Sequence, residues 1–103
     1  MSKEVSFKNH DRFIQLGVAI SSLRKIRGMS QEKLAEKAGI SRSLLSVIEA
    51  PNIAHCFSME VFYNIADALD VSPSDLLTAS LFPDNIMAIP HKPLKIRKKN
   101  GII

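Results

Sequence analysis

The side chains that could do chemistry in this chain are mostly charged, and their signs alternate along the sequence. Between Met1 and Leu44 nine Lys or Arg stand against four Asp or Glu. Between Leu45 and Phe82 there are no bases against five acids, and from Pro83 onward five bases against one acid. Two basic segments therefore flank an acidic one. This distribution favours a molecule that turns one face to a polyanion; solvated charge with chance asymmetry is the alternative.

Catalytic chemistry finds little support in the sequence. The chain has no Ser, His and Asp in triad order at a suitable turn, and no glycine-rich phosphate loop. His55 and Cys56 are adjacent, but only His10 and His91 stand elsewhere, which matches no recognised metal-site spacing. Cys56 fits better as a small buried hydrophobe. We therefore expect no enzymatic activity, no metal and no cofactor.

Length and composition indicate one globular domain. The chain has 103 residues, of which 46% are hydrophobic, enough to bury a core. The single cysteine cannot form an intrachain disulfide, and no apolar run approaches the length of a signal peptide or a membrane span. We expect a cytoplasmic protein that does not enter a membrane.

The cations and hydroxyls near the middle of the chain must be positioned by two short helices that a tight turn joins. Ser30 can cap the first helix, and Gly39 can take the left-handed conformation that ends it. Ser41 can cap the second helix, and Pro51 ends it. The apolar residues recur at helical spacing and should face a core: Leu34, Ala35, Ala38, Leu44, Leu45 and Ile48.

Three more helices are expected around this pair. A first helix over about 10–27 and a fourth over about 58–69 each carry an apolar stripe, and a fifth begins at the capping sequence Ser72-Pro73-Ser74-Asp75. The stripes are Phe13, Leu16, Ile20, Leu23 and Ile26 on the first, Met59, Phe62, Ile65, Ala66 and Leu69 on the fourth, and Leu76 and Leu77 facing inward on the fifth. The fold class is therefore all-α.

The two ends lack a helical pattern. Residues 1–9 should form a flexible segment that Phe7 can pin against the body, residues 10–82 the folded domain, and residues 83–103 a basic tail. Within the tail, Ile86 to Ile89 and Leu94 to Arg97 have the length of short strands. They predict either a small β-ribbon or an extended arm, with a solvated end as the alternative.

Several residues of the central pair also fall in a fixed register: Gln31, Leu34-Ala35, Gly39-Ile40-Ser41 and Ile48-Glu49. In this register the chain, from about Leu16 to Leu77, resembles the XRE, or phage-repressor-like, family of DNA-binding regulators. The resemblance implies a five-helix domain with a helix-turn-helix at helices two and three. It implies a transcription regulator that binds double-stranded DNA as a homodimer on an inverted-repeat operator, with a recognition helix over about 42–50 in the major groove.

The resemblance also assigns residues to the DNA. Bases would be contacted by Arg42, Ser43, Ser46 and Val47, and phosphates by Gln31, Ser41, Leu44, Asn52 and Arg24. Arg42 is the strongest of these for sequence readout, because a guanidinium matches the two acceptors on the major-groove edge of guanine. Val47 cannot hydrogen-bond, so it would touch a thymine methyl or add packing. The basic tail would contact DNA outside the main site or remain solvated.

Two structural roles are implied in the same way. Arg24 stands where the family places an Arg that pairs with the Glu closing the recognition helix, here Glu49. The fifth helix would form the dimer contact, through Leu77, Ala79, Leu81 and Phe82. The loop over 50–57 departs from the family pattern, because it has neither the usual glycine nor any Lys or Arg.

A different function remains open on the same fold. Some proteins of this type are antitoxins or interaction modules, in which the acidic second half or the tail would hold a partner protein. Such a module has no need for Arg42 and serines on the outer face of the third helix. The charge distribution favours DNA, and the neutral loop weakens that preference.

Overall fold

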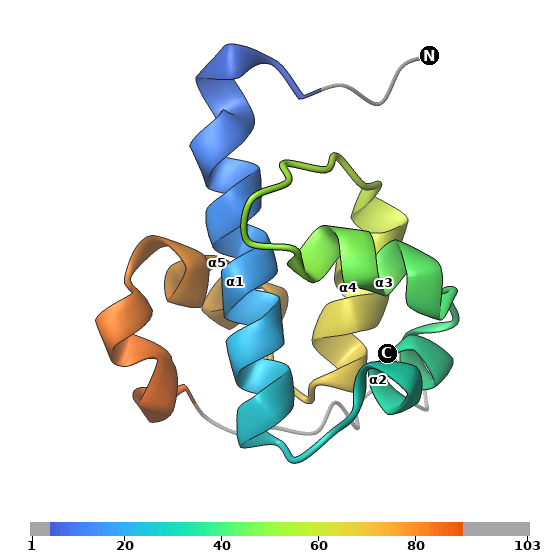
Figure 1. The fold of residues 1–103 in the computed structure, drawn as a ribbon. Helices are drawn as coiled ribbons and strands as arrows, with labels where there is room; N and C mark the ends of the chain where they lie inside the picture. The colour runs from blue at the N-terminus through green and yellow to red at the C-terminus, as the bar shows by residue number, and fades with distance from the viewer. Residues whose placement is uncertain (1–4, 90–103) are drawn as a thin grey trace, which may run out of the picture.

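The computed structural model describes residues 5–89, which form five α-helices and two short 3-10 helices (Figure 1). The elements are η1 (Phe7–Asn9), α1 (His10–Ile26), α2 (Gln31–Ala38), α3 (Arg42–Glu49), α4 (Met59–Ala68), α5 (Pro73–Leu81) and η2 (Pro83–Ala88). No strand occurs among these residues, and none of their helices is long and apolar enough to cross a membrane. The expected all-α, five-helix class is confirmed.

Serine caps begin four of the five α-helices. In α2 to α5 the Oγ of the preceding serine accepts a hydrogen bond from the backbone N–H three residues later, at 3.0 to 3.1 Å: Ser30 from Lys33, Ser41 from Leu44, Ser58 from Val61 and Ser72 from Asp75. Each cap satisfies a donor that the first helical turn leaves without a partner. The α2 helix ends at Gly39, whose φ of 70° lies in the left-handed region. These local signals placed the helix ends correctly.

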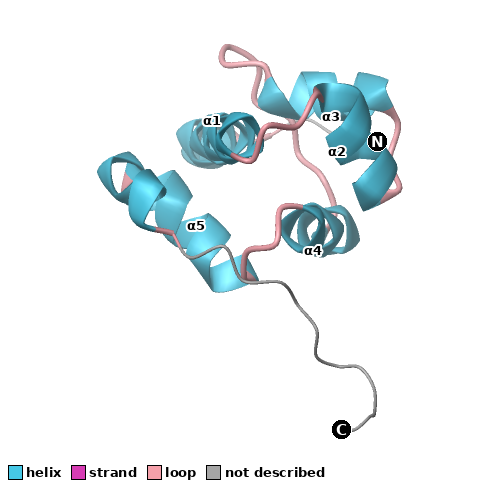
Figure 2. Ribbon diagram, turned by 90° about the horizontal axis from the view of Figure 1, so that it is seen from below, coloured by secondary structure: helices cyan, strands magenta, loops and turns pink. Residues whose placement is uncertain are grey.

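The core holds the α2–α3 pair at a fixed angle to the long helix α1. The α1 helix packs against α3 and α5, and α2 packs against α3 and α4 (Figures 1 and 2). Every one of these helices contributes to a single buried cluster, whose largest fully enclosed side chains are Ile20, Leu23, Leu34, Leu45, Ile48, Ile65, Leu69, Val71 and Leu76. Because both helices of the pair are anchored in this cluster, neither can rotate alone.

A glycine permits a close backbone contact between α1 and α3. Gly17 lies buried in the middle of α1, and a Cβ at this position would collide with the backbone carbonyl oxygen of Ile48 in α3. Only hydrogen fits between the two backbones. The register of α3 on α1 therefore depends on this residue.

Four apolar residues that we expected on the core are exposed instead. Ile26 and Met59, 42% and 59% exposed, are the last residue of α1 and the first of α4, where the helices extend past the core. Leu77 is 47% exposed because it follows the buried Leu76, and adjacent helical residues point about 100° apart. Phe7, in η1, is 97% exposed and does not pin the N-terminal segment to the body.

The strand expected at Ile86 to Ile89 is wrong. Residues 83–88 form η2, which begins with Pro83 and brings Ile86 and Ile89 half-buried against the core. Residues three apart lie on one side of a 3-10 helix, so this spacing buries both isoleucines where a strand would separate them. The other expected strand, Leu94 to Arg97, lies outside the described residues.

Candidate nucleic-acid interface

The outer face of α3 is polar and open to solvent. Arg42, Ser43 and Ser46 are all exposed and line one shallow hollow of about 300 Å³. On the opposite side of the same helix, Leu45 and Ile48 are 0% and 2% exposed in the core. The buried side fixes the helix, and the exposed side presents a guanidinium and two hydroxyls, which can pair with the donors and acceptors of a major groove.

Ser41 and Leu44 share the helix cap, which limits what each could offer a phosphate. The backbone N–H of Leu44 donates to the Oγ of Ser41 at 3.0 Å, so Leu44 has no free donor. Its side chain is half-buried against the core, and only van der Waals contact with a sugar remains open to it. The Ser41 hydroxyl is exposed and keeps its own hydrogen for donation.

Val47 and Asn52 differ in how accessible they are. Val47 is half-buried on α3, whereas Asn52 is exposed in the turn that follows α3. Because the loop over 50–57 holds no Lys or Arg, Asn52 and His55 are the polar side chains that it can direct to a backbone, and His55 is half-buried.

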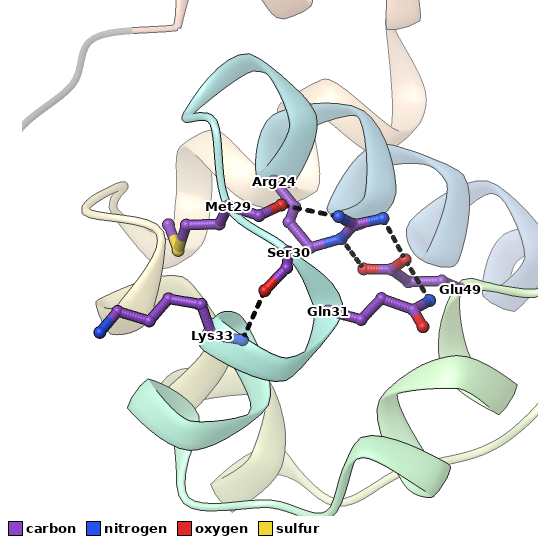
Figure 3. Close-up of polar contacts among 6 residues, drawn as sticks. All are labelled: Arg24, Met29, Ser30, Gln31, Lys33 and Glu49. Carbon is purple, nitrogen blue, oxygen red and sulfur yellow. Dashed lines mark hydrogen bonds and ion pairs between the residues drawn. The ribbon is translucent and has the colours of Figure 1, made fainter.

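The ion pair expected between Arg24 and Glu49 is present and joins α1 to α3. Arg24 Nε donates to Glu49 Oε2 at 2.9 Å and Nη2 donates to Oε1 at 3.1 Å, a two-point contact (Figure 3). A third hydrogen bond runs from Arg24 Nη1 to the backbone oxygen of Met29, at 2.7 Å. The two side chains are 11% and 3% exposed. Arg24 is thus committed to the protein and shows little surface to a phosphate.

Gln31 has a protein partner that the sequence did not predict. Its Nε2 donates to Glu49 Oε1 at 2.9 Å, so a single carboxylate links the first residue of α2 to α1 and α3 (Figure 3). We had expected the Gln31 amide to be free for a phosphate. The sequence did not predict this bond because the two residues are 18 positions apart, and no local sequence pattern indicates a side-chain partner at that separation.

Three of the four residues expected at a dimer contact are exposed apolar side chains on α5 or at its C-cap. Leu77, Leu81 and Phe82 are 47%, 61% and 58% exposed. Ala79 is 1% exposed, so its assignment to the contact is wrong: it points into the core between α5 and α1. Leu77 and Leu81 line a groove of about 320 Å³ with Phe13 and Leu16 of α1, two residues that the sequence suggested only for the core.

Comparison with known proteins agrees with this geometry. Residues 17–80 match the family model described as a helix-turn-helix domain. SinR, an HTH-type transcriptional regulator of Bacillus subtilis, is 40% identical over 62 residues, which cover 60% of this chain and 55% of SinR. The chain therefore spans about half the length of the curated relatives that it matches.

Solved structures with the same fold include two restriction-modification controllers. C.AhdI from Aeromonas hydrophila is 31% identical, with a TM-score of 0.57 over 62% of this chain and 94% of its own. C.Esp1396I bound to a 25 base pair operator site is 25% identical, with a TM-score of 0.60 over 75% and 97% of the two chains. Residues 17–80, which match the family model, contain α2 and α3.

Proposed function

Because the chain belongs to the helix-turn-helix domain family, we propose that it is a sequence-specific transcription regulator that binds its operator as a homodimer. The observation that carries the proposal is the division of α3 into a buried side and an exposed polar side. A helix held by Leu45 and Ile48 can enter a major groove without rearranging, and Arg42, Ser43 and Ser46 then meet the base edges.

Charge supports the same orientation. The exposed residues of α2 and α3 include three bases, Lys33, Lys37 and Arg42, against two acids, Glu32 and Glu36, and so carry one net positive charge (three minus two). In contrast, α4 and α5 carry three acids and no Lys or Arg. The α2–α3 side thus turns to the phosphates and the acidic side turns away. The basic tail beyond residue 89, which could add phosphate contacts, lies outside the described residues.

We expect a homodimer because one subunit contacts too few base pairs to recognise an operator specifically. One recognition helix contacts only a few base pairs, and two related by a two-fold axis would read half-sites about 34 Å apart. Leu77, Leu81 and Phe82 supply an exposed apolar face for such an axis. An operator of this protein should therefore be an inverted repeat.

The test begins by selecting preferred duplexes from a random-sequence pool with the wild-type protein. Arg42→Ala should then lose about 1–3 kcal/mol on the selected site and accept other bases at one position of each half-site, because it removes a base-reading guanidinium. Mobility-shift titrations on selected and random duplexes measure both effects. Glu60→Ala, at an exposed position of α4, is the control that should leave both affinities unchanged.

Equal losses for Arg42→Ala on selected and random DNA would refute the base-reading role. If the wild-type protein enriches no sequence and captures a protein instead, the interaction-module alternative takes the place of the regulator.

A further inference from the structure

The carboxylate of Glu49 is the most enclosed charged group among the described residues, and it accepts three hydrogen bonds. Oε2 accepts one from Arg24, and Oε1 accepts one from Arg24 and one from Gln31 (Figure 3). Its side chain is only 3% exposed. The Arg24 contacts alone would balance its charge, so the bond to Gln31 calls for a different explanation.

The hydrogen bond to Glu49 orients the side-chain amide of Gln31. A carboxylate only accepts hydrogen bonds, so Gln31 must present its nitrogen to Glu49. The same nitrogen carries a second hydrogen in the amide plane, and this plane is fixed once the first hydrogen is bound. Gln31 is half-buried at the first position of α2, beside backbone N–H groups that the helix start leaves without intrahelical partners.

We infer that Glu49 is a positioning residue, which holds the Gln31 amide so that its second N–H donates to a DNA phosphate. The inference rests on the proposed function and deepens it. The chain of contacts runs from Arg24 through Glu49 to Gln31, and only Gln31 touches the nucleic acid. This arrangement requires Arg24, which neutralises the charge of Glu49, because a carboxylate without a positive partner would repel a nearby phosphate.

Positioning improves affinity through entropy. A free glutamine has several rotatable bonds and loses that freedom when it binds a phosphate. Here the bond to Glu49 orders the side chain during folding, so less freedom remains to be lost when DNA arrives. The contribution of Gln31 to DNA affinity should therefore depend on Glu49. If Gln31 contacted the phosphate without help from Glu49, its contribution would be the same with and without Glu49.

The side-chain amide resonances of Gln31 provide a direct test. They can be assigned by their absence in the Gln31→Ala spectrum, and a short duplex of mixed sequence serves as the probe because phosphate contacts are independent of sequence. In the free protein this side-chain amide should exchange with solvent more slowly than a glutamine amide in the unfolded chain. Saturation with duplex should then shift one of its two protons. Unchanged resonances at saturation overturn the inference.

A cycle of variants tests the dependence on Glu49. Gln31→Ala should weaken duplex binding about three- to tenfold, the effect of one hydrogen bond. Asn64→Ala, which removes a half-buried side-chain amide from α4, is the control that should leave binding unchanged. The double variant Arg24→Met/Glu49→Leu removes the acceptor, and apolar replacement of a buried pair often preserves stability. In that background Gln31→Ala should weaken binding less than it does in the wild-type background, because an amide without Glu49 loses more conformational freedom when it binds a phosphate.

Two outcomes contradict this account in different ways. If Gln31→Ala weakens binding equally in both backgrounds, or not at all, Glu49 does not position it and the inference fails. If the wild-type protein binds no duplex at low salt, the proposed function itself fails. The resonance measurement needs no change to the ion pair, so it decides the matter even if the double variant does not fold.

Discussion

At the scale of single residues, the close contact at Gly17 predicts that Gly17→Ala destabilises the protein, whereas helix propensity alone would predict that it stabilises the protein. Replacing a mid-helix glycine by alanine ordinarily stabilises by about 0.5–1 kcal/mol. In Gly17→Ala the new methyl meets the carbonyl oxygen of Ile48, which belongs to the backbone and cannot rotate away. We expect a net loss of about 1–3 kcal/mol from separating α1 and α3, measured by urea denaturation. Lys25→Ala, exposed on the same helix, is the control, and a stabilised Gly17→Ala would contradict the close contact.

The same scale shows where sequence reasoning works and where it stops. The outer position of Ser46 and the inner position of Ile48 were predicted correctly, because residues two apart on a helix point about 160° away from each other. Ala79 was misassigned because an alanine at a helix end fits a core or a surface equally well. The bond from Gln31 to Glu49 depends on the packing of three helices. A lone glycine such as Gly17 inside an apolar stripe is the one signal of a close contact that the sequence did offer.

At the scale of elements, the serine caps determine where four helices begin, and α4 offers the clearest test. Ser58→Ala removes the acceptor for the Val61 N–H and should cost about 1 kcal/mol of folding free energy. Ser58→Asn retains a capping oxygen and should stay within a few tenths of a kcal/mol of wild type. Thermal or denaturant unfolding of both variants decides this, and equal stability of Ser58→Ala and Ser58→Asn would contradict a capping role.

Cap chemistry also explains why the helices were predicted more accurately than the ends of the chain. A serine, a glycine or a proline acts on the backbone of its own turn, so Ser30, Gly39 and Pro73 marked their boundaries in the sequence. The η2 helix begins with a proline, Pro83, but no side chain caps its first turn. Its isoleucines fit a strand by propensity, and only their packing against α1 and α5 decides for a 3-10 helix.

At the scale of the whole molecule, the fold separates two surfaces. The α2–α3 pair lies on one side of α1, and α5 lies on another (Figures 1 and 2). The exposed polar residues of α3 are therefore separated from the apolar groove that Leu77 and Leu81 line with Phe13 and Leu16. A dimer formed through the groove would leave α3 free, as reading an inverted repeat requires. The sequence predicted the α5 half of this surface, and Phe13 and Leu16 add the α1 half.

This arrangement predicts that a charge in the groove separates the subunits without unfolding them. Leu81 is 61% exposed in the single chain, so Leu81→Glu should change the stability of the monomer by no more than about 0.5 kcal/mol. Burying the carboxylate in a dimer would be costly, and sedimentation should show monomers. Binding to a full inverted repeat should then weaken about a hundredfold or more, because two linked contacts become one, while binding to an isolated half-site is retained. Tyr63→Glu, a charge at a comparably exposed position on α4, should leave the dimer intact; if Leu81→Glu also remains dimeric, the subunits meet through another surface.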